Sequence, residues 1–182
     1  PLLEAIQAEK NVYIRSCLLL YLLTGARREE LLRAKWQDID LHRAEWRIPE
    51  TKGGRIHYVP LSTAAVSIFR QIPKVEGNEY VFPGKKAGTR LVNIKDPWGR
   101  VRKAAGLEDV RLHDLRRTTA SWAAIGGGSL LAIGKLLGHR NAATTEIYAR
   151  LSQSPVRDIA EGVGGKIVSF MAIQEQQKKA AE

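Results

Sequence analysis

The sequence predicts a mainly α-helical domain with a small antiparallel β-sheet, which is an α+β fold. Apolar residues recur at helical spacing through most of the chain. Two short extended runs flank a Gly-Gly pair, which is a hairpin signal. Helix caps and glycine stops separate the other helical stretches. The 182 residues are 44% hydrophobic, so the chain is long enough and apolar enough to fold as one domain with a real core.

The N-terminal part of the chain begins with helical sequence and continues into the predicted hairpin. Residues 4–25 have an apolar helical face, and Gly25 is a suitable helix end. Residues 28–40 are expected to form a second helix or helical turn. The runs "EWRIPE" (45–50) and "RIHYVPL" (55–61) then flank Gly53 and Gly54 as two short strands.

The rest of the chain is helical on either side of one long loop. The Ser-Thr pair at 62–63 predicts the start of a helix, and residues 73–90 are rich in Pro, Gly and Lys. A helix is expected around Asp96-Pro97, and another over residues 111–126 has Leu112, Leu115, Thr119 and Trp122 roughly in phase.

Ser129 and Gly138 predict the start and the stop of a further helix, and residues 143–151 are expected to be short and helical. After a glycine break at Gly164-Gly165, a last helix is expected to carry Ile167, Phe170 and Met171. We predict a single domain over residues 1–182, in which residues 155–182 form a C-terminal tail.

The charge balance favours a polyanionic partner. The chain has 29 Lys and Arg against 19 Asp and Glu, a net charge of +10. An excess of this size is typical of proteins that bind nucleic acid, although a solvated basic surface is the simpler alternative. The single cysteine, Cys17, excludes disulfides and cysteine-based zinc sites. No apolar stretch is long enough for a membrane span and no signal peptide is recognisable, so an intracellular, cytoplasmic location is expected.

Three segments combine groups that suit chemistry on a phosphodiester. In "TGARREELL", Arg27 follows a glycine stop and Glu30 can brace it by an ion pair, although a charged helix start is the simpler interpretation. In "LHDLRRTTASW", His113 and Arg116 are three residues apart on one helical face, whereas Arg117 points elsewhere. In "LGHRNAATTEIYARL", His139 follows a helix end and Tyr148 lies nine residues later.

These groups match the needs of attack on a phosphate. Arginine and histidine side chains stabilise the oxygens as charge builds up in the transition state, and tyrosine supplies a nucleophile for a covalent intermediate. The free tyrosine pKa is about 10, so a neighbouring base or a cationic field is needed. A zinc site is disfavoured because His42, His57, His113 and His139 are scattered without metal-ligand spacing.

The same segments resemble the tyrosine recombinase (phage integrase) family over about residues 10–152. "TGARREELL" resembles the family's first arginine motif, "TKGGRIHYVPL" its lysine hairpin, "HDLR" its H-x-x-R motif and "LLGH" its second histidine motif. The resemblance assigns catalytic roles to six residues and a supporting role to Glu30. The six are Arg27, Lys52, His113, Arg116, His139 and the nucleophile Tyr148.

The resemblance also implies a mechanism and partners. Tyr148 would attack the scissile phosphate of double-stranded DNA, giving a 3′-phosphotyrosyl bond and a free 5′-hydroxyl, before strand exchange and religation without metal, ATP or any other cofactor. Family members assemble as homo-tetramers on DNA, and the same is expected of this chain. Without DNA, the chain is expected to be a monomer. The family's N-terminal core-binding domain is expected to be absent from this chain. We further expect Arg28, Arg55, Arg117 and Arg140 to contact DNA.

Two other functions remain open at this point. A type IB topoisomerase would use similar chemistry to relax supercoils, and a non-catalytic DNA-binding protein could keep the same fold. The intact set of six residues favours a recombinase from a phage, prophage or other mobile element, acting at the nucleoid of a bacterial host. The target DNA sequence, the choice between integration and excision, and the docking of the C-terminal helix in cis or in trans are left open by the sequence.

Overall fold

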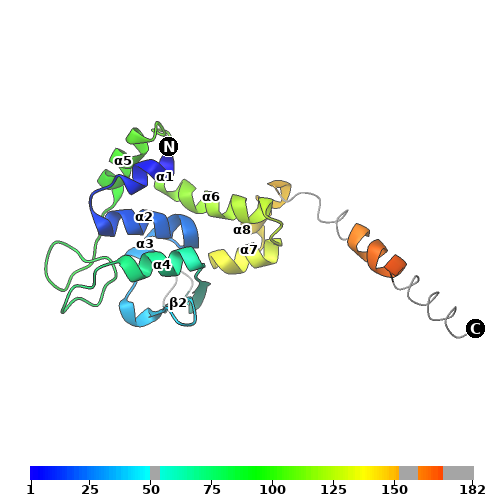
Figure 1. The fold of residues 1–182 in the computed structure, drawn as a ribbon, viewed down its shortest axis with the longest axis horizontal. Helices are drawn as coiled ribbons and strands as arrows, with labels where there is room; N and C mark the ends of the chain where they lie inside the picture. Colours follow the sequence, from blue (N-terminus) through cyan, green and yellow to red (C-terminus); the bar gives the residue numbers. More distant parts are fainter. Residues whose placement is uncertain (50–53, 152–159, 170–182) are drawn as a thin grey trace, which may run out of the picture.

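The computed structural model of the protein describes residues 1–49, 54–151 and 160–169. The predicted α+β class is confirmed, since the helices form most of the body and one three-stranded antiparallel sheet lies at its edge (Figure 1). The helices are α1 (Leu2–Gln7), α2 (Val12–Thr24), α3 (Arg28–Leu32), α4 (Thr63–Gln71), α5 (Lys95–Ala104), α6 (Leu112–Ile125), α7 (Leu130–Leu137) and α8 (Ala143–Glu146). The 3₁₀ turns η1 and η2 span Trp36–Asp38 and Ala149–Leu151.

The sheet has the order β1-β2-β3, with β1 at Ile39–Asp40, β2 at Glu45–Ile48 and β3 at His57–Pro60. Its register pairs Trp46 with Val59, and both side chains are buried. Residues on alternate positions of a strand face opposite sides, so this pair fixes which face of the hairpin joins the core. The predicted turn at Gly53 lies outside the described residues, whereas the two predicted strands are confirmed.

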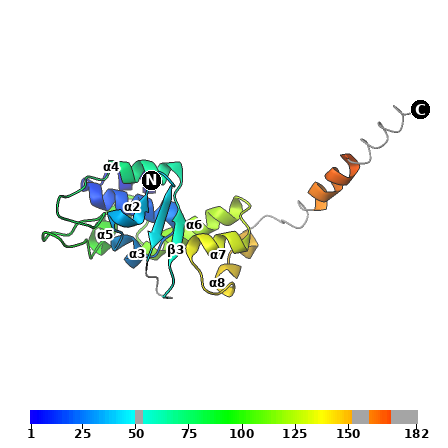
Figure 2. The ribbon, with the colours of Figure 1, turned by 90° about the horizontal axis from the view of Figure 1, so that it is seen from below.

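The main core is centred on α2, which packs against α4 on one side and α6 on the other. Its largest fully buried side chains include Trp46, Phe69 and Phe82, from the sheet, α4 and the long loop. A second, smaller cluster lies between α6, α7 and α8 and consists of Ala120, Ala124, Ile133, Leu137 and Tyr148. Figure 2 shows β3 running beside α7, so the sheet reaches the elements that carry this second cluster.

The continuous helix predicted over residues 4–25 is wrong, because the chain breaks between Gln7 and Val12. Asn11 caps α2 instead, and its side-chain Oδ1 accepts the backbone N–H groups of Tyr13 and Ile14. A short amide side chain satisfies the free donors of a helix start, so it favours a new N-terminus over helix continuation.

The helical stretch expected over residues 28–40 is also shorter than predicted, because α3 ends at Leu32. The backbone N–H of Trp36 donates to the Glu79 carbonyl, and Val81 donates to the Ala34 carbonyl. Backbone groups of the distant loop thus take the place of the partners that a longer helix would supply. The local sequence of residues 28–40 does not reveal this pairing.

The apolar face predicted for residues 111–126 needs one correction at Trp122, which is 72% exposed. The buried stripe of α6 follows Arg116, Ala120 and Ala124, spaced by four residues, and the ring of Trp122 falls outside it. The loop-rich stretch and the caps at Ser62 and Ser129 are confirmed, with each serine oxygen accepting a backbone N–H three residues on.

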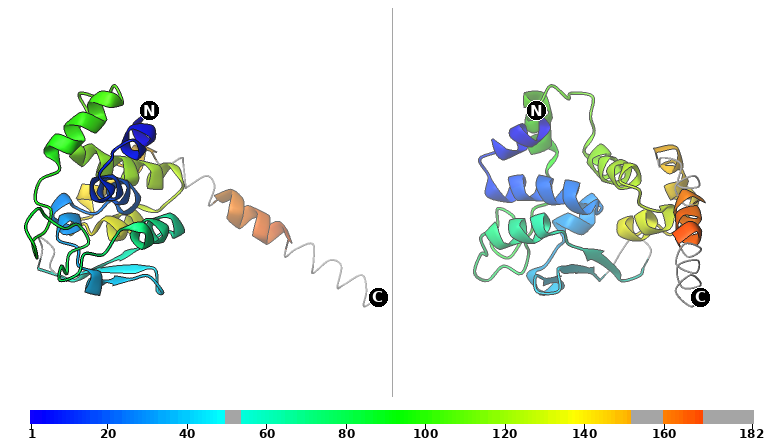
Figure 3. Two further views of the ribbon diagram at one scale, coloured as in Figure 1. Left: turned by 60° about the vertical axis from the view of Figure 1, so that its left-hand side comes forward. Right: turned by 45° about the vertical axis from the view of Figure 1, so that its right-hand side comes forward.

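The tail contains a helix at residues 160–169, and all ten residues are exposed. Figure 3 shows it projecting away from the helical body. The predicted break at Gly164-Gly165 is wrong, since the helix continues through both glycines. Glycine costs about 1 kcal/mol relative to alanine in a helix but retains helical backbone angles, so the pair weakens the helix without ending it. The expected Phe170 and Met171 lie outside the described residues.

Candidate active site

The first site residue, Arg27, is positioned by a tight turn between α2 and α3. Gly25 ends α2 with a left-handed backbone (φ 61°), and Arg27 then caps α3. The Glu30 carboxylate accepts both the backbone N–H of Arg27 at 2.9 Å and its Nη1 at 2.9 Å. The predicted brace between these two residues is therefore confirmed, and it orients a guanidinium group that remains partly exposed.

The second arginine, Arg116, is buried on α6, with only 5% of its surface exposed. Its Nη1 donates to the Gly25 carbonyl and its Nη2 donates to the Leu137 carbonyl at 2.7 Å. These bonds join the end of α2 to the end of α7 through one side chain. Burial, followed by the charge of nearby Arg27, lowers the pKa of Arg116.

The C-terminal turn of α7 is where three segments of the chain meet. Consecutive carbonyls of Leu136, Leu137 and Gly138 accept His57 Nε2, Arg116 Nη2 and Arg27 Nη2, at 3.2, 2.7 and 3.2 Å. The last carbonyls of a helix lack helical partners and carry its negative dipole end. The carbonyl groups of this turn therefore hold both guanidinium groups in place.

Gly138 itself is confirmed as the predicted helix stop, with φ at 63°. A Cβ atom at this position would come within 3.0–3.2 Å of the His57 ring. Both the left-handed backbone and the ring contact therefore require glycine here.

His139 follows this turn directly and is held by a single side chain. Its Nδ1 is 2.8 Å from the Thr145 hydroxyl oxygen, and its backbone N–H donates to the Gly134 carbonyl. Burial lowers the pKa of His139 to about 4, and the charges of Arg116 and Arg27 act in the same direction. The imidazole is thus neutral at physiological pH in the DNA-free protein.

Tyr148 lies between α8 and η2, but it is 7% exposed and packs in the second cluster. Its ring packs with Ala120, Ala124 and Leu137 in this cluster. Within the described residues its hydroxyl group makes no hydrogen bond, and its electrostatic neighbour is Arg116. The residue is therefore near the arginine site with an uncommitted hydroxyl.

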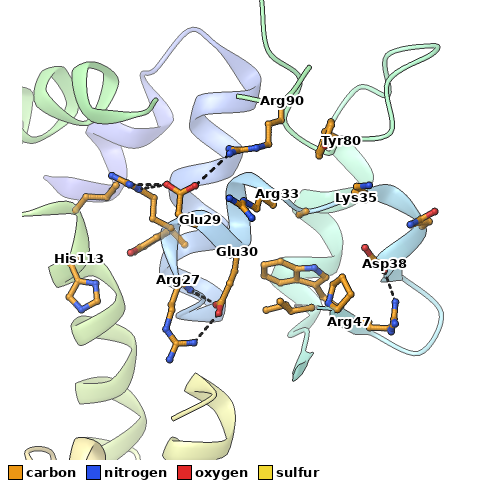
Figure 4. Close-up of a pocket in the computed structure, with 18 residues that line it drawn as sticks. Arg27, Glu29, Glu30, Arg33, Lys35, Asp38, Arg47, Tyr80, Arg90 and His113 are labelled. Carbon is orange, nitrogen blue, oxygen red and sulfur yellow. Dashed lines mark hydrogen bonds and ion pairs between the residues drawn. The ribbon is translucent and has the colours of Figure 1, made fainter. Parts of the chain in front are cut away.

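His113 is exposed at the first turn of α6 and lies at one end of a basic pocket. Figure 4 shows it across from Arg27 and Glu30, with Arg47 toward the other end. Partial desolvation of the ring by its surroundings, then the charges of Arg116 and Arg117, lower the pKa of His113. The pocket cations include Arg28, Arg33, Lys35 and Arg90.

The four arginines predicted to contact DNA differ in their exposure and in their ion pairs. Arg28 is partly exposed and paired with Glu29 at 2.8 Å, whereas Arg55, Arg117 and Arg140 are exposed. Arg117 forms an ion pair with Asp114 at 3.2 Å. Lys52, the sixth predicted catalytic residue, lies outside the described residues. The other five come together around Arg116 and the end of α7.

Sequence reasoning missed two residues at this site, His57 and Thr145. His57 occupies a strand beside the "VPL" segment, and Thr145 is the second of two adjacent threonines. The only sign of either residue in the sequence was a polar side chain within a segment that also carries a predicted site residue. In the described part of the chain, no three His, Cys, Asp or Glu side chains gather to hold a metal ion. No described helix is long and apolar enough to cross a membrane.

Comparison with known proteins identifies the family. The pattern of the Phage integrase family matches residues 1–154. The chain belongs to the phage integrase family. Tyrosine recombinase XerC of Xanthomonas axonopodis pv. citri (strain 306) is 30% identical over 174 residues, which cover 92% of this chain and 54% of that protein. The chain thus spans about half the length of this relative.

Two solved structures share the fold of this family member. The catalytic domain of bacteriophage HP1 integrase superposes with a TM-score of 0.69 at 23% identity, covering 88% of each chain. The XerH site-specific recombinase bound to difH substrate, in a pre-cleavage complex, gives a TM-score of 0.70 at 23% identity, covering 81% of this chain and 47% of that one. The fold of this integrase-family chain is therefore that of a tyrosine recombinase catalytic domain.

Proposed function

We propose that this domain cuts and rejoins DNA at specific sites through a covalent bond to Tyr148. The observation that carries the proposal is the convergence of Arg27 and Arg116 on the end of α7, beside His139. Two fixed guanidinium groups and an imidazole suit a phosphodiester whose two non-bridging oxygens gain charge during attack.

In the proposed reaction, the Tyr148 oxygen attacks the scissile phosphorus and the 5′-oxygen leaves. The tyrosine loses its proton, the 5′-oxygen gains one, and a 3′-phosphotyrosyl ester replaces the DNA phosphodiester. A 5′-hydroxyl of the same or another strand then reverses the step, so rejoining needs no external energy source. Because Tyr148 is 7% exposed, the segment around α8 has to open for its hydroxyl to reach DNA.

Two residues are proposed to move the protons. The lowered pKa of His113 keeps its imidazole neutral at pH 7, which suits acceptance of the tyrosine proton. Lys52 is proposed to protonate the leaving 5′-oxygen from the hairpin between β2 and β3. A 5′-phosphorothiolate substrate has an acidic leaving group, so it should restore cleavage to Lys52→Ala and not to Arg116→Ala. Equal lack of rescue in both variants would contradict the acid role.

Double-stranded DNA is the proposed partner. The net charge of +10 and the basic pocket beside Arg27 both favour a phosphate backbone. The structural neighbour XerH was solved with its difH substrate, which supports the same partner for this chain.

The decisive experiment traps the covalent intermediate. The chain is incubated with nicked duplexes of randomised sequence, in which the fragment released by cleavage diffuses away, and attached DNA is recovered and sequenced. We expect an adduct that Tyr148→Phe abolishes and that Tyr58→Phe, which removes the hydroxyl of an exposed strand residue, leaves intact. An adduct in Tyr148→Phe would exclude this nucleophile, and DNA binding without any adduct would favour a non-catalytic binder.

Assembly is proposed to use the tail, with a monomer in solution and a homo-tetramer on DNA. Val163 and Ile167 lie one helical turn apart and are both more than half exposed, and such an apolar stripe requires a covering surface. Packing of this helix on its own domain is not found in the described residues. Deleting residues 165–182 should lower the mass of the DNA complex in sedimentation without unfolding the domain. An unchanged mass would contradict docking in trans.

A further inference from the structure

Thr145 is buried beside His139, although the other residues of its short helix are exposed. Only 1% of its surface is exposed, although α8 is a single helical turn whose other residues, Ala143, Thr144 and Glu146, are exposed. Its hydroxyl oxygen also lies against α7, 3.1 Å from where a Cβ on Gly134 would be. The side chain is therefore enclosed between α7 and His139.

The hydrogen bond between Thr145 and His139 has a direction that can be worked out. In the described residues, His139 Nδ1, at 2.8 Å, is the one hydrogen-bond partner of the Thr145 hydroxyl. Other threonines of the fold, Thr24 and Thr118, donate instead to the carbonyl four residues earlier. A buried hydroxyl whose proton has no acceptor loses free energy, so Thr145 donates and Nδ1 accepts.

This direction fixes the protonation of the ring. A neutral imidazole carries one proton, and a ring that accepts at Nδ1 carries it at Nε2. Arg27 and Arg116, the charged groups that act on the ring from α3 and α6, both oppose a second proton. The ring thus presents a single N–H donor on the side opposite Thr145.

We propose that Thr145 is a positioning residue that holds His139 in the Nε2–H form, so that Nε2–H donates to a non-bridging oxygen of the scissile phosphate. The donation to phosphate rests on the proposed function, whereas the contact that sets the ring does not. Because Tyr148 donates its backbone N–H to the Thr145 carbonyl at 3.0 Å, the same turn of chain holds the ring and carries the nucleophile. Movement of this turn would change the ring and the tyrosine together.

The first test measures the ring without DNA. Chain labelled with ¹⁵N-histidine reports the proton position on each ring nitrogen, and His139→Gln assigns the signals of His139 among the four histidines. At pH 7 we expect a protonated Nε2 and a bare, hydrogen-bonded Nδ1. Thr145→Val, which keeps the shape and removes the hydroxyl, should shift the Nδ1 signal, whereas Thr145→Ser should restore it.

The matched control is Thr144→Val on the exposed neighbour, which should leave the His139 signals unchanged. A proton on Nδ1 in the unsubstituted chain, or identical spectra for Thr145→Val and the unsubstituted chain, would overturn the proposal. The measurement on the unsubstituted chain decides the bond direction even if Thr145→Val does not fold.

The second test measures covalent attachment to DNA recovered from the trapping experiment. Loss of a group that orients a reacting side chain typically costs about tenfold or more, so Thr145→Val should slow attachment about tenfold and Thr145→Ser much less. Equal slowing by the valine and serine variants would assign Thr145 to packing alone and overturn its positioning role. If the chain attaches to no DNA, the proposed function fails, while the ¹⁵N spectra still test the contact.

Discussion

The two buried clusters of the molecule differ in size, and the difference divides the site into a fixed part and an adjustable part. The main core is filled by large side chains such as Trp46, Phe69 and Phe82 around α2. The second cluster has two alanines, Ile133, Leu137 and the ring of Tyr148. Less apolar area is buried there, so fewer contacts oppose a local opening.

The site residues divide in the same way. Arg27 and Glu30 belong to α3, whose Leu31 and Leu32 are fully buried in the main core. Tyr148 belongs to the second cluster, and His139 follows α7, whose buried apolar side chains lie in that cluster. Arg116 spans both parts through its two carbonyl partners. In the proposed reaction, the phosphate oxygens would therefore meet the rigid part of the fold, while the proposed nucleophile lies on the part that opens more easily.

Removing the link between the two clusters should have the largest effect. Arg116→Ala loses a proposed phosphate ligand and leaves the buried Gly25 and Leu137 carbonyls without this donor. We expect covalent attachment to slow by about 10²–10³-fold and the free energy of unfolding to fall by about 2–4 kcal/mol. Single-turnover kinetics and urea denaturation measure the two effects. Arg70→Ala, at an exposed position in the last turn of α4, should change neither quantity measurably, and similar losses in both variants would refute the link.

Equivalent leucines in the two clusters should respond differently to truncation. Leu31→Ala in the main core should lower the free energy of unfolding by about 3 kcal/mol, as for other fully buried leucines. Leu137→Ala should cost about half as much globally, because the smaller cluster can relax. It should selectively reduce hydrogen-exchange protection in α7 and α8. Uniform loss of protection across α2 and α7 in the Leu137 variant would show that the two clusters unfold as one unit.

The pH dependence of stability tests the adjustable part. The pKa of His139 is about 4 in the folded chain, against an ordinary value of 6.5. As pH falls from 6.5 toward 4, the unfolded chain binds a proton that the folded chain does not, so stability decreases. The lowered pKa of His113 acts in the same direction.

Thermal unfolding between pH 4 and pH 8 measures this slope. His139→Gln should flatten it in part, whereas His42→Gln, at an exposed turn, should keep it. An equal slope in the chain and in His139→Gln would mean that His139 gains no proton on unfolding in this range.

The smallest expected effect concerns single surface cations. DNA affinity should fall as salt rises, with a logarithmic slope that loses about 0.9 for each phosphate contact removed. Arg140→Ala, at an exposed residue beside His139, should reduce the slope by this amount without altering the unfolding transition. Fluorescence anisotropy at several salt concentrations measures the slope, and an unchanged slope would remove Arg140 from the proposed interface.

The sequence predicted those parts of the fold and site that depend on local chemistry. Gly25 and Gly138 end helices because glycine readily adopts the left-handed backbone that follows a last turn. Ser129 begins a helix because its hydroxyl oxygen accepts a free backbone N–H of the first turn. The pairing of Arg27 with Glu30 is equally local, as it closes within one helical turn. The family pattern over residues 1–154 confirms the resemblance from which the other site residues were predicted.

The features that escaped prediction depend on contacts between distant segments. The end of α3 is set by hydrogen bonds to residues 79–81, and the burial of Tyr148 is set by alanines of α6. Thr145 was missed because its partner and its enclosure by α7 exist only in the folded chain. Helical periodicity likewise could not show that the buried face of α6 excludes Trp122.

The contact of His57 with Gly138 has a consequence for protein engineering. The His57 ring occupies the space that any side chain at position 138 would need, so β3 and the end of α7 form one fitted joint. The segment between β2 and β3 could then be exchanged for that of a relative, provided that the graft ends before His57. A graft that replaces His57 would remove the ring that fits against Gly138 and would disturb the turn whose carbonyls accept both arginines.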